Sequence, residues 1–374
     1  MGDARDSMTA LRPTTVLAPG KLILMGEHAV VYQRPALTTT IDRWLRVHMA
    51  PRSEPGVALR LEAMDYHETT TWRALRAYAD EIRARWEQYV EAPTPEAFAH
   101  MRGNDPAHLV KVALGESDRQ LTDAARVPLD ITIRSDQPIG AGFGSSAAVA
   151  AAMIRAFATL QGIELSNATR HRLVLDVERR QHGTPSGVDT ATVLHGGLLW
   201  AERNGRGLKH TSLTPASSIL NTLRVFHTGR PRESTGTVVD AVRARRDDDP
   251  KAFQEALDRM ETATRAFRDA LVDPNTLPSA AIAPIRQFEA GLELMGVVPD
   301  SIQQLIRAVE DQGGAAKISG AGALSGPAAG SLLVIHPDPE ANLWDHLDPH
   351  LTTSLTPMQL RLGVPGTHES HSYA

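Results

Sequence analysis

The chain has 374 residues, more than one ordinary domain of about 150 residues, so its length predicts two lobes with a cleft between them. Its formal net charge of −5, from 39 Lys and Arg against 44 Asp and Glu, offers no basic field for nucleic acid or an anionic membrane. With no Cys, the chain lacks disulfides, thiolate chemistry and Cys-bound metals, which suits a reducing compartment.

The apolar stretches are too short to span a membrane. The longest, near 147–154, is far below the roughly 20 residues that a membrane helix needs. Residues 1–6 are charged and lack the apolar centre of a signal peptide. We therefore expect a cytoplasmic protein that binds neither membranes nor nucleic acid.

The first elements expected along the chain are strands. Apolar residues on both sides of Pro19 and Gly20 predict two strands joined by a turn. Alternating patterns at 44–47 and 57–61 predict further strands of the same sheet. From 72 to 90, apolar residues recur at three- and four-residue steps, which predicts an amphipathic helix with its aromatic side chains in the core.

The middle of the chain alternates between strand and helix patterns. Residues 129–133 alternate like a strand, and the Ala-rich segment 147–160 predicts a helix after an intervening loop. Ser166 or Asn167 can cap the next helix, which we expect to end near Gln181.

The second half predicts three helices and two strands. The helices are expected near 250–272, 279–295 and 301–312, the last capped by Asp300, and the strands near 315–318 and 331–335. Because helices and strands are mixed throughout, the fold class is α+β. A polar stretch at 205–222 marks the expected boundary between the lobes.

The strongest chemical signal is a glycine-rich loop, residues 138–144, that leads into a helix. Its glycines, Gly140, Gly142 and Gly144, let the backbone approach an anion, and the helix that starts near Ser145 and Ser146 supplies free N–H groups. No Lys follows, as in a Walker A loop, and Ser145 stands where a dinucleotide fingerprint has its third Gly. The segment therefore predicts a phosphate cradle, and a purely structural turn with a Ser cap is the alternative.

Three weaker signals accompany this loop. Glu178 precedes the tight segment 183–189, which ends on a carboxylate that could otherwise be an ordinary helix cap. Lys21 stands near a Gly-Glu-His run, although a lone Lys is usually exposed and a lone His usually structural. A second glycine loop at 317–322 is weak by itself.

Together, the segments 18–32, 138–148 and 317–322 resemble, in order and spacing, the three signatures of the GHMP kinases. This family includes galactokinase, homoserine kinase, mevalonate kinase and phosphomevalonate kinase, and the resemblance covers roughly 16–335. The runs at 26–32, 35–37 and 182–189 are similar to the mevalonate kinases in particular, as is the segment 228–235.

The resemblance implies a two-lobed α+β fold with the active site between the lobes. An N-terminal α/β lobe would cover 14–210, and a C-terminal ferredoxin-like α/β lobe would cover 211–365. The implied reaction is ATP-dependent phosphorylation of the primary hydroxyl of (R)-mevalonate, giving 5-phosphomevalonate for isoprenoid biosynthesis, with ATP and Mg²⁺ as cofactors.

The resemblance also implies roles for individual residues. Asp189 would act on the acceptor hydroxyl as a base or orienting carboxylate, and Lys21 would pair with it and stabilise charge on the attacking oxygen. Ser146 and Glu178 would hold Mg²⁺, and the separation of Glu178 from Asp189 matches the mevalonate kinase pattern. The remaining implied contacts are Gly140, Gly142, Gly144, Ser145 and Ser146 on the triphosphate, and Glu27, His28 and Ser186 near the acceptor.

The chemistry of phosphoryl transfer independently demands such a set. It requires an anion cradle, a divalent ion on the phosphate oxygens, a cation near the developing charge and a carboxylate at the nucleophile. Magnesium needs only one or two protein ligands because waters and phosphates supply the rest.

Three alternatives stay open. The acceptor could be phosphomevalonate or another small alcohol, particularly if Arg230 and Arg232 reach the cleft. The second alternative is a diphosphomevalonate decarboxylase, although that enzyme usually lacks the Gly-Glu-His run. The third is an inactive binding protein, although such a protein would have lost part of the catalytic set. The loop 323–330 departs from the family's glycine-rich pattern. We expect this loop to contact the glycine-rich loop 138–144 and the acceptor. The sequence also leaves a homodimer open.

Overall fold

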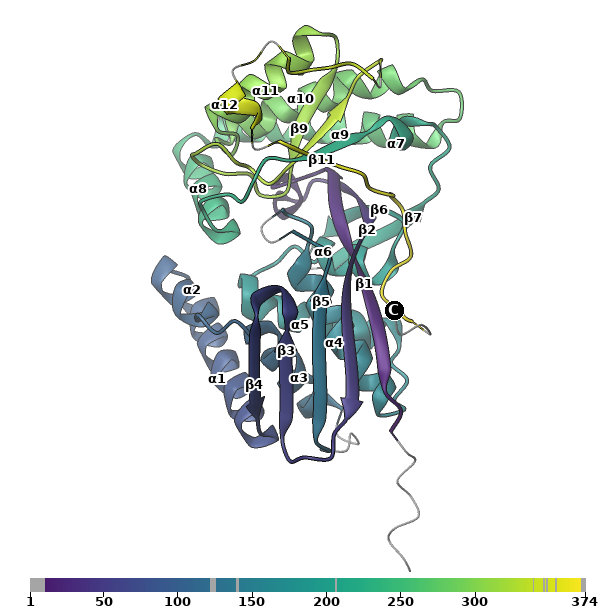
Figure 1. The fold of residues 1–374 in the computed structure, drawn as a ribbon. Coiled ribbons are helices and arrows are strands. Elements are labelled where there is room, and N and C mark those ends of the chain that lie inside the picture. The colour runs from purple at the N-terminus through teal and green to yellow at the C-terminus, as the bar shows by residue number, and fades with distance from the viewer. Residues whose placement is uncertain are drawn as a thin grey trace, which may run out of the picture.

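The computed structural model describes residues 11–121, 126–138, 141–205, 207–338, 340–345, 347, 349–353 and 355–370. Gly140, one of the predicted phosphate contacts, lies outside the described residues. The described chain forms two stacked lobes, each built on its own sheet (Figure 1). This confirms the predicted α+β class and two-lobed arrangement.

The N-terminal lobe contains an eight-stranded sheet within the described residues. Its central path runs β12-β1-β2-β5-β3-β4, with β6 added beside β2 and β7 beside β6. Its strands are β1 (Thr14–Met25), β2 (Ala36–Pro51), β3 (Val57–Leu61), β4 (Tyr66–Thr70), β5 (Leu129–Ser135), β6 (Leu198–Asn204), β7 (Gly207–Leu213) and β12 (His368–Glu369).

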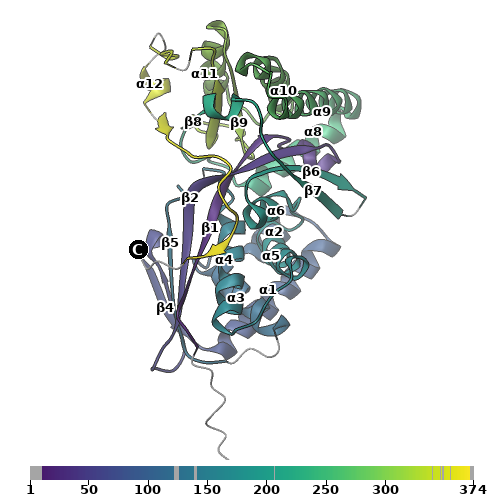
Figure 2. The same ribbon diagram turned by 90° about the vertical axis from the view of Figure 1, so that its right-hand side faces the viewer.

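Helices cover one face of this sheet (Figure 2). They are α1 (Trp72–Glu91), α2 (Pro95–Arg102), α3 (His108–Gln120), α4 (Ser145–Leu160), α5 (Asn167–His182) and α6 (Val188–His195), with the short 3₁₀ turns η1 (Ala29–Tyr32) and η2 (Glu62–Met64) nearby. The predicted helices α1, α4 and α5 are confirmed, and Ser166 caps α5 by accepting a hydrogen bond from the Thr169 backbone N–H. Among the described helices, none is long and apolar enough to cross a bilayer.

The start of the chain corrects one prediction. Instead of two strands joined at Pro19 and Gly20, β1 runs without a break and pairs with β2 along its length. The register shifts by a bulge between these two residues, so the strand continues through the sequence that predicted a turn. Lys21 directly follows this bulge.

The C-terminal lobe is built on a four-stranded antiparallel sheet in the order β11-β8-β10-β9. Numbered within the lobe, this is the order 4-1-3-2 of a ferredoxin-like sheet, as predicted. The strands are β8 (Arg224–His227), β9 (Ala315–Ser319), β10 (Ser331–Ile335) and β11 (Thr356–Met358).

Helices α10 and α11 pack against β9, and α9 packs against α10; the three confirm the helices predicted in the second half. The elements are α7 (Ile219–Thr222), α8 (Thr235–Asp248), α9 (Pro250–Val272), η3 (Pro278–Ala281), α10 (Ile282–Leu294), α11 (Asp300–Asp311) and α12 (Pro349–Thr352). Asp300 is not the predicted cap, since it is the first helical residue and Pro299 precedes it.

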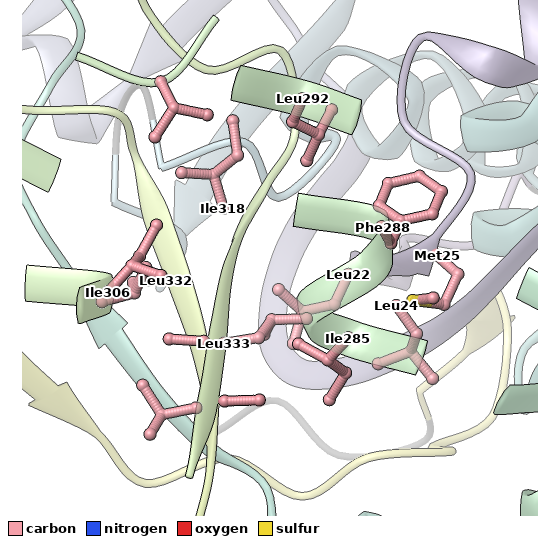
Figure 3. Packing of buried hydrophobic residues seen from close by; sticks show 14 of the residues in the cluster. Leu22, Leu24, Met25, Ile285, Phe288, Leu292, Ile306, Ile318, Leu332 and Leu333 are labelled. Carbon is pink, nitrogen blue, oxygen red and sulfur yellow. The ribbon is translucent and has the colours of Figure 1, made fainter. Parts of the chain in front are cut away.

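The end of β1 joins the cores of the two lobes. Leu22, Leu24 and Met25 belong to the same buried cluster as Phe288 of α10 and Leu333 of β10. Figure 3 shows the three β1 side chains beside α10. Because Lys21 lies in the same strand, its position is set by packing in both lobes.

The chain returns to the N-terminal lobe at its C-terminal end (Figure 1). Strand β12 pairs antiparallel with β1, and Glu369 forms an ion pair with Arg155 of α4. Backbone hydrogen bonds between 361–364 and the β2 residues Thr40 and Asp42 hold the intervening segment in place.

Candidate active site

Lys21 and Asp189 form an ion pair in the candidate active site. The Nζ atom of Lys21 lies 3.1 Å from Oδ1 of Asp189. Lys21 is buried in β1, whereas the Asp189 side chain, in the first turn of α6, is 34% exposed. A buried cation beside an accessible carboxylate suits a reaction in which a group from solvent is bound and charge develops next to the Lys.

The glycine-rich loop lies directly over this pair. The backbone N–H of Lys21 donates to the carbonyl of Phe143 at 2.9 Å. Gly144 has a φ of +69°, and a Cβ there would lie 2.8 Å from Cγ of Lys21 and 3.5 Å from Oδ2 of Asp189. Only Gly fits this position, because both the backbone conformation and the close approach exclude a side chain.

Helix α4 begins at this loop and directs its N-terminus into the site. Gly144 is its N-cap, and no described side chain caps that end. The N–H groups of the first turn, which includes Ser145 and Ser146, therefore have no intrahelical acceptor and are available to an anion. This geometry suits the predicted phosphate cradle.

Ser146 and Glu178 lie together behind the Lys21–Asp189 pair. Ser146 hydrogen-bonds to Nε2 of His182 at 3.0 Å, and that nitrogen lies 4.0 Å from Oε2 of Glu178. Glu178 is buried, and its Oε1 has no hydrogen-bond partner among the described residues. Burial and the nearby charge of Asp189 raise the pKa of Glu178 to about 8.

These two residues fit a magnesium ion. An orphaned buried carboxylate oxygen beside a hydroxyl offers the hard oxygen ligands that Mg²⁺ takes, and a cation would stabilise the ionised form of Glu178. The described residues contain no group of three acidic or His side chains that could hold a metal alone. An ion bound here would therefore take its other ligands from water and phosphate.

His182 is a site residue to which sequence reasoning gave no role. It lies four residues after Glu178 on α5, so both face the same side of the helix, and that spacing was the available signal. Burial lowers the pKa of His182 to about 4, so the imidazole is neutral at neutral pH. It can hold the Ser146 hydroxyl without adding charge.

The three predicted acceptor contacts have different partners in the structure. Ser186 is partly buried, three residues before Asp189, and accepts a hydrogen bond from the Val188 backbone N–H at 3.3 Å. Glu27 is instead buried in an ion pair with Lys317 of β9. His28, also buried, hydrogen-bonds through Nε2 to the carbonyl of Ala321 at 2.9 Å.

The atypical loop 323–330 is anchored on the segment before α8. Glu233 accepts hydrogen bonds from the backbone N–H of Leu324 at 3.2 Å and from Oγ of Ser325 at 2.6 Å. Arg232 is exposed, and its guanidinium packs against Gly326.

The hydrogen bond from this region to the glycine-rich loop comes from a flanking residue. Oγ of Ser331 donates to the carbonyl of Ala141 at 2.7 Å. The carbonyl of Ser319, before the atypical loop, lies where a Cβ on Gly142 would approach to 3.1 Å. Ser319 and Ser331, on either side of 323–330, thus make these contacts with the glycine-rich loop.

Several known proteins are similar to this chain over most of its length. The model of the GHMP kinases N terminal domain matches residues 108–197. The mevalonate kinase of Pyrococcus horikoshii is 30% identical over 311 residues, covering 82% of this chain and 84% of the relative. The mevalonate kinase of Bos taurus is 29% identical over 347 residues, covering 82% and 83%.

Solved structures share the fold. A crystal structure of mevalonate kinase has a TM-score of 0.70 at 17% identity and covers 93% of this chain and 98% of its own. The L. major mevalonate kinase in complex with R-mevalonate has a TM-score of 0.62 at 18% identity and covers 86% of each chain. The chain has the site described above and is 30% identical to the Pyrococcus protein over most of both lengths. It therefore belongs to the mevalonate kinase family of the GHMP kinases.

Proposed function

We propose that this protein transfers the γ-phosphoryl group of ATP to the primary hydroxyl of (R)-mevalonate, giving 5-phosphomevalonate. The observation that carries the proposal is the contact of Lys21 with Asp189 directly beneath Gly144, at the N-terminus of α4. A phosphate bound at the N-terminus of α4 would therefore lie next to an alcohol bound to Asp189. The relatives named mevalonate kinase support mevalonate as the alcohol.

Each residue of the site has a separate task in this reaction. The carboxylate of Asp189 orients the acceptor hydroxyl and takes its proton as the new P–O bond forms, while the β–γ P–O bond of ATP breaks. The ammonium group of Lys21 stabilises the negative charge on the oxygens in transit. The N–H groups at the start of α4 bind the phosphates and hold them in line.

Ser146 and Glu178 would hold the magnesium ion. When bound, this ion neutralises charge on the phosphate oxygens. His182 fixes the Ser146 hydroxyl, and burial of Glu178 keeps water from its carboxylate. We extend the proposal to a cytoplasmic location and to lobes divided near residue 210, towards the end of β7 and before β8, the first strand of the second sheet.

The choice of acceptor is tested by a substrate panel. With ATP and Mg²⁺, kcat/KM for (R)-mevalonate should exceed that for phosphomevalonate, galactose and homoserine by at least about tenfold each. The Lys21–Asp189 pair contributes one buried cation, Lys21, whereas Arg230 and Arg232 are exposed on the segment that contacts 323–330. A preference for phosphomevalonate would mean that these arginines serve a second phosphate, and would overturn the mevalonate assignment.

Asp189→Asn should lower kcat about 10²–10⁴-fold and leave ATP affinity nearly unchanged, because the amide cannot take the hydroxyl proton. Steady-state rates and calorimetric binding of a non-hydrolysable ATP analogue would measure the two effects. Asp130→Asn, which changes an Asp of β5 that is exposed and outside the site, is the matched control. Turnover near the wild-type rate in Asp189→Asn would remove this carboxylate from the mechanism.

Ser146→Ala and Glu178→Gln should each raise the Mg²⁺ concentration needed for half-maximal activity, by about tenfold or more, because each removes an oxygen ligand. The effects in the double variant should be less than additive, since both residues bind one ion. Titration of activity against Mg²⁺ at saturating ATP measures this. Unchanged titration curves in both single variants would place the ion elsewhere.

A further inference from the structure

Lys317 is a buried cation that the proposed chemistry does not use. Its side chain is fully buried in β9, and Nζ contacts Oε1 of Glu27 and donates to the carbonyl of Ile318 at 2.6 Å. Glu27 follows β1 in the N-terminal lobe, so this ion pair crosses the junction between the lobes. Nζ also lies 5.4 Å from the ring centroid of Phe288 on α10.

Alternate residues beyond Lys317 make the same crossing. Oγ of Ser319 donates to the backbone carbonyl of Ile23 at 2.9 Å and accepts from the backbone N–H of Ile23 at 3.2 Å. The carbonyl of Ala321 accepts from His28. The side chains of Lys317 and Ser319 lie on one face of β9, and with the carbonyl of Ala321, just beyond the strand, they form the edge that attaches the C-terminal lobe to the end of β1.

This edge also touches the glycine-rich loop. The carbonyl of Ser319 is close enough to Gly142 that an added Cβ would lie 3.1 Å away, and Gly320 faces the same glycine. The loop continues to Gly144, which covers Lys21 and Asp189. A shift of β9 along β1 would therefore displace the phosphate cradle above the reacting groups.

Two buried carboxylates lie near Lys317. Burial raises the pKa of Glu27, and contact with Lys317 opposes that rise. On the other side, Glu289 of α10 accepts from the Ile318 backbone N–H at 3.1 Å, and burial raises its pKa to about 8. Glu289 thus contacts the backbone of β9, whereas Glu27 contacts Nζ of Lys317 directly, so Glu27 is the carboxylate that pairs with Lys317.

A buried ion pair is a costly way to join two surfaces. Apolar residues of similar volume often stabilise a fold as well or better, whereas a charged pair specifies one arrangement because any other leaves a buried charge without a partner. The surrounding cluster is apolar, and because apolar contacts are not directional they do not by themselves specify one register. The pair is thus suited to fixing alignment more than to adding stability.

We propose that Lys317 is a positioning residue, whose ion pair with Glu27 aligns β9 with β1 and so holds the glycine-rich loop over Lys21 and Asp189. The inference rests on the proposed function only in naming the nucleotide as the ligand of that loop. It gives Glu27 a role in aligning the lobes in place of the predicted contact with the acceptor.

The test compares Lys317→Met, Glu27→Gln and the double variant by thermal unfolding and by calorimetric binding of Mg²⁺ and a non-hydrolysable ATP analogue. Each single variant leaves one buried charge unpaired and should lower the unfolding temperature by roughly 10 °C. The double variant removes both charges and should recover most of that loss. We nevertheless expect its nucleotide Kd to remain at least about tenfold above wild type, and its kcat about tenfold below, since neutral partners no longer specify the register.

Lys111→Met is the matched control. Lys111 is a second buried Lys paired with two carboxylates, Glu68 and Asp105, but it lies in α3 within the N-terminal lobe. This variant should lose comparable stability and bind the nucleotide with wild-type affinity. If Lys317→Met fails to fold, the double variant carries the test.

Recovery of wild-type nucleotide binding together with stability in the double variant would overturn the proposal, because the pair would then be purely structural. An equal loss of binding in Lys111→Met would also overturn it. Analogue binding needs no acceptor, so a wild-type protein that binds the nucleotide but does not phosphorylate mevalonate would count against the proposed function alone.

Discussion

The buried ammonium group of Lys21 is the constraint on which the site depends. A charge taken out of water must be met by an opposite charge, and here Asp189 meets it at 3.1 Å. That requirement places α6 against β1, and it leaves the carboxylate partly exposed where an alcohol can reach it. The same contact requires glycine at 144, because any side chain there would collide with Lys21. Stability of the buried cation and access to the nucleophile therefore depend on the same atoms.

The lobes contribute different parts to this point, so their alignment matters to the chemistry. The N-terminal lobe provides Lys21, Asp189 and the start of α4, whereas the C-terminal lobe supports the glycine-rich loop through Ser319 and Ser331. Strand β1 belongs to both cores, since its last residues pack against α10 (Figure 3). Distortions in the second lobe can thus reach the phosphate cradle without any direct contact with the reactants.

Structural features that are set by residues within one segment were predicted correctly, whereas features that depend on distant partners were not. The period of α1, the Ser cap of α5 and the glycine turn that leads into α4 are set by neighbouring residues, and the structure has all three. The continuity of β1 through Pro19 and Gly20 is decided by pairing with β2, which absorbs the irregularity as a bulge. Glu27 joins Lys317 from 290 residues away, and no local pattern indicates that pair. His182 was within reach of prediction, because its spacing from Glu178 places both on one helical face.

The most direct measurement is a crystal structure of the protein with Mg²⁺, a non-hydrolysable ATP analogue and (R)-mevalonate. The account predicts the primary hydroxyl oxygen within about 2.6–3.2 Å of an Asp189 carboxylate oxygen. It also predicts Nζ of Lys21 beside the γ-phosphate, and oxygen atoms of Ser146 and Glu178 bound to Mg²⁺. A hydroxyl held beyond hydrogen-bond reach of Asp189, with another acid or cation in its place, would contradict the account.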